Sequence, residues 1–125
     1  MDWVVRIGLV ELAIGGLLGW AMVIRAERPE WLRRIGIVAP QRIRQVHLDY
    51  VMMGLILIGV GLAVSDLPTA VAAALVFGTF VNPLLFVPLA FYPDAEKQLW
   101  YRSLAVVSFL AMSGSLVVAA VVGPG

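Results

Sequence analysis

The chain has 125 residues, of which 62% are hydrophobic and 14% are charged, and its net charge is +1. A soluble domain usually has about 45–50% apolar and about 25% charged residues, so this composition predicts a chain surrounded by lipid. The small net charge gives no basis for nucleic-acid binding, and the lack of cysteine excludes disulfides, thiolate metal sites and thiol catalysis. The N-terminus lacks the basic region of a signal peptide, so we expect the first apolar segment to be retained.

Four segments are long and apolar enough to cross a bilayer, which takes about 20 residues of helix. They cover residues 7–24, 46–64, 67–92 and 103–122. Glu11 is the one charge in the first segment, the second has His47 and Asp49 near its start, and the last two have none. The sequence therefore predicts an all-α membrane protein, a four-helix transmembrane bundle that forms a single domain over residues 1–125.

The first connection, residues 25–45, is the longest and most basic. Pro29 followed by Glu-Trp-Leu predicts a short interfacial helix, because proline suits the first helical turn. Trp31 would lie at the depth of the lipid headgroups. Pro40 is expected to start the second long helix, which would place His47 about two turns inside it.

The other two connections are short. Residues 65–68 should form a tight turn, and residues 93–97 should lead to the last helix, where Trp100 and Tyr101 are expected to be interface anchors. The first and third connections, with the start of the last helix, hold all Lys and Arg residues except Arg6. Because cytoplasmic loops are enriched in basic residues, we expect both termini outside the cytoplasm, in a cell (inner or plasma) membrane.

Small residues recur at spacings typical of helix contacts. Gly15 and Gly19 lie four apart in the first segment; further small residues are Gly54, Gly59 and Gly61 in the second and Ser115 and Ala119 in the fourth. Such spacing lets two helix backbones approach closely in a membrane. These contacts would lie either within the chain or between copies in a homo-oligomer.

Glu11 is a candidate functional residue, because an ionisable group at membrane depth is costly. It follows Arg6 by five residues, about one and a half turns into the first helix. One interpretation is a carboxylate near the interface that pairs with Arg6 or reaches the headgroups. The other is a buried carboxylate that exchanges protons or binds cations.

His47 is the single histidine of the chain. At offsets of three, four and seven it shares a helix face with Tyr50, Val51 and Gly54. A histidine near a helix start is often a polar interface residue. Imidazole is nevertheless the one strong nitrogen ligand in this sequence, so a metal or haem would have to use it.

Asp49 lies two residues after His47 and therefore on another face of the same helix. Arg42 and Arg44 precede it on this helix. We expect Asp49 to pair with one of these arginines or to contact a neighbouring helix.

The third segment contains Asn82, Pro83 and Pro88. Proline removes a backbone donor and frees carbonyl groups, which predicts a kink with the Asn82 amide beside it. Phenylalanines at 77, 80, 86 and 91 either pack and face lipid or form a flat cofactor pocket. The sequence has no Gly-rich phosphate loop and no Ser/His/Asp set, and with one histidine and no cysteine it disfavours hydrolytic or zinc chemistry.

Two segments, residues 44–48 (RQVHL) and 78–82 (GTFVN), follow a Gly-rich first helix and a basic connection. In this order they resemble the styrene oxide isomerase and hydroxylaminobenzene mutase family of small membrane proteins. The resemblance covers most of the chain as architecture and these two segments as motifs. It implies a homotrimer of four-helix subunits with haem b between them and His47 as axial ligand. In the isomerase, ferric iron acts as a Lewis acid on an epoxide oxygen and opens the ring towards an aldehyde.

The chain also departs from this family. Asn82 matches a family asparagine, but the isomerase has an asparagine where this chain has Met53 and a tyrosine where it has Phe86. The resemblance therefore implies haem binding, with an apolar distal pocket for a small apolar ligand, more than isomerase activity. Met52 or Met53 is a candidate second axial ligand. The residues expected around the cofactor are His47, Tyr50, Met53, Asn82 and Phe86.

Two other functions fit the sequence. Four helices with one carboxylate in the first resemble the small multidrug resistance transporters, where Glu11 would alternate between protons and cationic drugs; the long first connection is a departure from them. The chain also fits an accessory or assembly subunit of a membrane complex without a cofactor. An absorption spectrum and a proton-release assay distinguish these alternatives.

Overall fold

The computed structural model describes residues 2–125. The described chain is helical and contains no strand. Its elements are α1 (Asp2–Glu27), α2 (Pro29–Arg34), α3 (Gln41–Ala63), α4 (Thr69–Leu84), α5 (Phe86–Phe91), the 3-10 helix η1 (Pro93–Lys97) and α6 (Leu99–Val122).

Four helical stretches are long and apolar enough to cross a membrane: α1, α3, α4 together with α5, and α6. The predicted all-α fold class with four such helices is confirmed. Most helices extend beyond the predicted apolar segments, since polar residues at helix ends can reach headgroups and water. The interfacial helix starts at Pro29 as predicted, and Pro40 directly precedes the first residue of α3.

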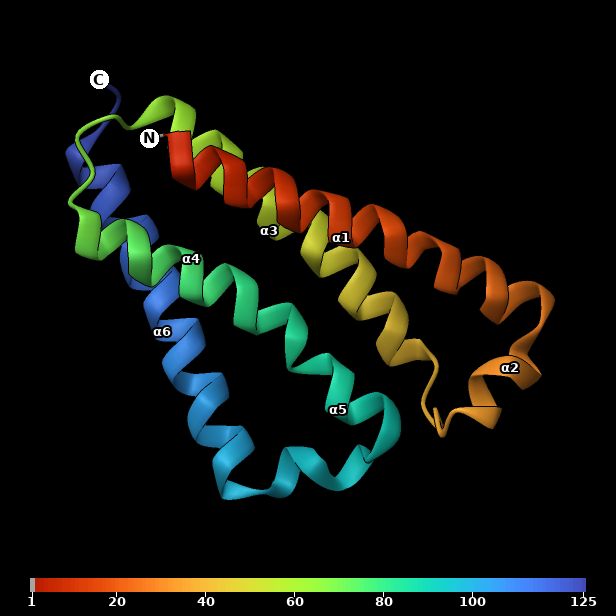
Figure 1. Ribbon diagram of the computed structural model, residues 1–125. Helices are drawn as coiled ribbons and strands as arrows, with labels where there is room; N and C mark the ends of the chain where they lie inside the picture. Colours follow the sequence, from red (N-terminus) through yellow and green to blue (C-terminus); the bar gives the residue numbers. More distant parts are fainter. Residues whose placement is uncertain (1) are drawn as a thin grey trace.

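The four long helices form two pairs, α1 with α3 and α4 with α6, and the pairs are joined by contacts of α3 with α4 and α5 (Figure 1). Both termini lie at one end of the molecule, where the pairs come together, and α2 and η1 lie at the other end, where the pairs spread apart (Figure 1). The end that carries the basic connections is therefore the wider end of the bundle, with α5 between α3 and α6 (Figure 1).

Glycines allow close contact between α1 and α3. An added Cβ would come within 3 Å of a neighbouring atom at Gly8, Gly15, Gly54 and Gly61. On Gly54 it would lie 2.7 Å from the Gly8 carbonyl oxygen, whereas Gly59 has nothing within 4 Å. The interpretation as contacts within the chain is thus confirmed for Gly54 and wrong for Gly59.

The third membrane span is interrupted, as the prolines predict. Helix α4 ends at Leu84, α5 starts at Phe86, and Leu85 stands between them. Pro83 and Pro88 lack the N–H groups that would continue the hydrogen-bond ladder. The span therefore bends at the place where Asn82 lies.

Two tyrosine hydroxyls donate to carbonyl groups around this break. Tyr50 of α3 donates to the Phe80 carbonyl and Tyr101 of α6 to the Leu85 carbonyl, each at 2.9 Å. Tyr101 is buried, so the prediction that it is an interface anchor is wrong, whereas Trp100 is exposed. The two hydroxyls join α3 and α6 to opposite sides of the interrupted span.

Candidate functional site

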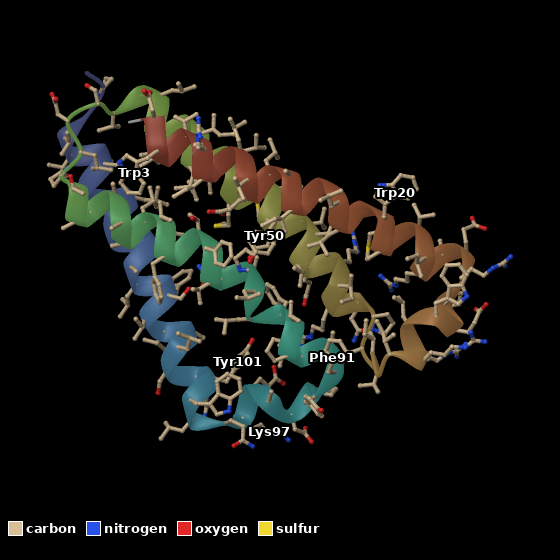
Figure 2. The ribbon with its side chains drawn as sticks, in the orientation of Figure 1. Trp3, Trp20, Tyr50, Phe91, Lys97 and Tyr101 are labelled. Atoms are coloured by element: carbon tan, nitrogen blue, oxygen red, sulfur yellow. The ribbon has the colours of Figure 1, made fainter. Side chains whose placement is uncertain are left out.

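The residues predicted to surround a cofactor lie in three different places. Met53, Asn82 and Phe86 line one cavity of about 280 Å³, whose walls also include Asp49, Phe109 and Met112. His47 lies instead at the contact of α3 with α1. Tyr50 is buried between α3 and α4, where its ring meets that of Phe80 edge to face (Figure 2). The structure therefore brings three of the five predicted residues together.

The His47 ring is held by a backbone carbonyl. Its Nδ1 lies 2.5 Å from the carbonyl oxygen of Gly15, which can only accept a hydrogen bond. Nδ1 is therefore the donor, and in the neutral ring Nε2 keeps its lone pair. Metal-binding histidines are commonly oriented by such a bond from the second ring nitrogen. A Cβ on Gly19 would approach the His47 ring to 3.4 Å, so small residues of α1 leave space beside it.

The described residues form no cluster of the side chains that usually bind metal ions. Across residues 2–125, no group of three or more His, Cys, Asp or Glu side chains is placed to hold a metal ion. His47 could thus bind a metal alone or as the axial ligand of a macrocycle that brings its own four nitrogens.

Asn82 has a fixed orientation in the cavity that it lines. Its Oδ1 accepts a hydrogen bond from Ser108 at 2.6 Å, and its Nδ2 donates to the Met112 sulfur at 3.5 Å. Both partners belong to α6, which joins the polar side chain at the break to the last helix. A second cavity of about 440 Å³ shares Asn82, Phe86 and Phe109 and extends to Tyr101 and Leu110. The two cavities therefore adjoin.

Asp49 lines the smaller cavity, a position that its sequence context does not reveal. Its side chain is half-buried and makes no hydrogen bond or ion pair within residues 2–125. Arg42 lies 3.8 Å from Glu96 and donates to Gln45 instead. The expected pairing of Asp49 with an arginine is wrong, and Asp49 instead shares the lining of this cavity with residues of α4, α5 and α6.

Glu11 is fully buried between α1 and α4. Its Oε2 lies 3.0 Å from the hydroxyl of Thr79, and its Oε1 has no partner in the described part of the chain. Of the two interpretations of Glu11, the buried carboxylate is confirmed, and the pairing with Arg6 is wrong. Because Glu11 has no exposed surface, a drug-sized cation cannot reach it in this structure, which weakens the exporter hypothesis. Sequence reasoning missed Thr79, whose only signal was a hydroxyl inside an apolar helix.

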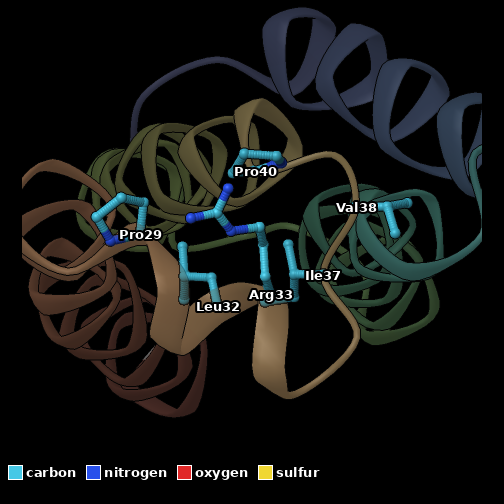
Figure 3. A pocket seen from close by; sticks show the side chains of 6 residues that line it. All are labelled: Pro29, Leu32, Arg33, Ile37, Val38 and Pro40. Atoms are coloured by element: carbon cyan, nitrogen blue, oxygen red, sulfur yellow. The ribbon is translucent and has the colours of Figure 1, made fainter.

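A third cavity lies at the edge of the membrane-spanning region, next to α2. It measures about 560 Å³ and is lined by Pro29, Leu32, Arg33, Ile37, Val38 and Pro40. The Arg33 guanidinium extends between the two prolines (Figure 3). This cavity therefore combines one basic group with mostly apolar walls.

Comparison with protein-family models, curated proteins and solved structures finds no match to this chain. The family assignment therefore stays a prediction based on residues 44–48 and 78–82. His47 and the cavity lined by Asp49 and Asn82 are the features of the structure that bear on function.

Proposed function

We propose that this protein is a membrane haem protein in which Nε2 of His47 is the axial ligand of the iron. The observation that carries the proposal is the hydrogen bond from Nδ1 of His47 to the Gly15 carbonyl. This bond fixes the ring and leaves Nε2 with a free lone pair, the state that an iron ligand needs. Bound haem would supply the remaining nitrogen ligands, which the chain lacks.

We further propose that the cofactor is shared between copies of the chain. None of the cavities described above is lined by His47, so a porphyrin would need a cover beyond the α1–α3 pair. The homotrimer implied by the family resemblance would supply that cover. The proposal concerns haem binding and not a reaction, because Met53 and Phe86 replace the polar groups that the isomerase uses.

An absorption spectrum of the protein tests the proposal. The chain is expressed with added haem precursor, purified in mild detergent and assayed for a Soret band and for haem per chain. We expect a Soret band in the wild type, its loss in His47→Ala, and its return when free imidazole is added to that variant. Gln45→Ala, an exposed change on the same helix, is the matched control and should keep the band.

Two results would reject the proposal. One is a colourless wild-type protein that stays colourless when haem is added to the purified sample. The other is an unchanged spectrum in His47→Ala, because the iron would then be held by a different residue.

A further inference from the structure

Asp49 is a carboxylate inside a membrane span. It follows Gln41, the first residue of α3, by eight positions, which places it about 12 Å along the helix axis at 1.5 Å per residue. A charge at this depth is costly unless it is paired or reaches water. Its side chain is half-buried and lines the cavity shared with Asn82, so it faces a space between helices.

No positive charge of the described chain neutralises Asp49. Arg42, two turns earlier on the same face, is directed to Glu96 of η1 and to Gln45. The cavity walls contribute no other charged group. Within residues 2–125, no three His, Cys, Asp or Glu side chains are placed to hold a metal ion, so Asp49 has too few ligands around it for a divalent ion. An organic monocation can supply the counter-charge that the described chain does not.

The walls of the cavity suit such a cation. Phe86 and Phe109 provide aromatic rings, whose faces attract ammonium and guanidinium groups. Met53 and Met112 add polarizable thioethers that adapt to ligand shape. The hydroxyl of Ser108 and the Met112 sulfur hold the Asn82 amide, so it does not compensate the carboxylate.

The adjoining cavity offers room for an apolar tail. It measures about 440 Å³, beside the 280 Å³ next to Asp49, and its walls are mostly apolar. Ligand pockets typically measure about 300–1,000 Å³ and combine apolar walls with a few polar groups. A charged head at Asp49 and an aromatic or alkyl tail towards Leu110 would fill both spaces.

We propose that the two adjoining cavities form a binding site for a lipophilic organic monocation, such as an aryl-alkyl ammonium, whose head pairs with the Asp49 carboxylate. The site needs no haem, so it does not rest on the function proposed above. Its walls come from α3, α4, α5 and α6, and Phe109 among them is exposed, so a ligand could reach it from the lipid phase.

Ligand-observed ¹⁹F NMR on the full chain in neutral-lipid nanodiscs tests this site. The probes are 4-(4-fluorophenyl)butylamine and 4-(4-fluorophenyl)butan-1-ol, which share a tail and differ in the charge of the head. Empty nanodiscs measure partitioning into lipid. We expect saturable binding of the amine, at least tenfold weaker binding of the alcohol, and at least tenfold weaker amine binding in Asp49→Asn. Asp66→Asn, which changes an exposed carboxylate in the α3–α4 turn, should bind the amine as the wild type does.

The comparison of amine and alcohol on the wild type requires no variant, so a misfolded Asp49→Asn protein would not block the test. Equal binding of the two probes, or amine binding no greater than in empty nanodiscs, would overturn the proposal. Amine binding no greater than in empty nanodiscs is also the result expected if a basic residue of a second copy already occupies the cavity. Unchanged amine affinity in folded Asp49→Asn would overturn it as well. A colourless but amine-binding protein would reject the haem proposal alone.

Discussion

Replacing Gly54 with alanine should separate α1 from α3. The new Cβ would lie 2.7 Å from both the Gly8 carbonyl oxygen and the Leu12 backbone nitrogen. Ordinary contact begins at 3.4 Å, so the backbones would have to move apart by about 0.7 Å, because neither atom belongs to a flexible side chain. Gly59→Ala, on the same helix with nothing within 4 Å, is the matched control.

The size of the effect follows from two opposing terms. Alanine is favoured over glycine in a helix by up to about 1 kcal/mol, and both variants gain this. Overpacking at a tight contact costs about 1–3 kcal/mol, and only Gly54→Ala bears this cost. Loss of close packing matters in a membrane, where lipid gives no hydrophobic drive for helix association. We therefore expect Gly54→Ala to be less stable than Gly59→Ala by about 1–3 kcal/mol.

Reversible unfolding in mixed detergent micelles, followed by tryptophan fluorescence, measures both variants against the wild type. Since the helix-propensity term cancels between them, the difference isolates the contact. Equal stability of the two variants would refute the inference that Gly54 sets the distance between α1 and α3.

Three further variants test contacts that the structure assigns to single side chains. Thr79→Val removes the one hydrogen-bond partner of Glu11 and should lower the free energy of unfolding by about 1–3 kcal/mol, because it leaves a buried polar group unsatisfied. Tyr101→Phe removes the hydroxyl bonded to the broken span and should cost about 0.5–1.5 kcal/mol in the same assay. Arg33→Gln should lose most of the thermal stabilisation that anionic phospholipid gives the detergent-solubilised protein, whereas Arg34→Gln should keep it.

Each of these variants has an internal control. Ser113→Ala removes a hydroxyl that bonds within its own helix, and Tyr92→Phe changes an exposed tyrosine, so both should stay within about 0.5 kcal/mol of the wild type. A Thr79→Val protein as stable as Ser113→Ala would show that Glu11 does not depend on this bond. Equal lipid effects in the two arginine variants would show that the stabilisation depends on general surface charge and not on the Arg33 cavity.

The sequence predicts what depends on local composition. The spans follow from apolar length, and the interruption of the third span follows from Pro83 and Pro88, because each proline acts on its own backbone. The interfacial helix at Pro29 and the start of α3 after Pro40 are local in the same sense. These features can be predicted without knowing how the helices pack.

Partners across helices were not predictable in this way. Tyr101 follows Trp100 in what looks like an aromatic belt, yet the turn of α6 directs it to the Leu85 carbonyl. Glu11 has Arg6 close in sequence but meets Thr79, which is 68 residues away. Which side chains meet across helices depends on how whole helices are rotated and paired. The glycine contacts determine the rotation only once it is known which helices pair.

The geometry of α3 also limits how a haem and the cavity can cooperate. At about 100° per residue, Met53 points some 120° away from His47 around the helix axis, and Asp49 some 160° away. The structure agrees, because His47 bonds to α1 while Met53 and Asp49 line the cavity between α3 and α6. Met53 therefore cannot be the second axial ligand of an iron held by His47 in the same chain. If His47 binds haem, a ligand in the cavity of the same chain cannot contact this iron, whereas a ligand in the cavity of a neighbouring copy can. Such a shared site needs His47 from one copy and Asp49 from the other. A mixture of His47→Ala and Asp49→Asn chains would then restore shared sites that neither variant forms alone.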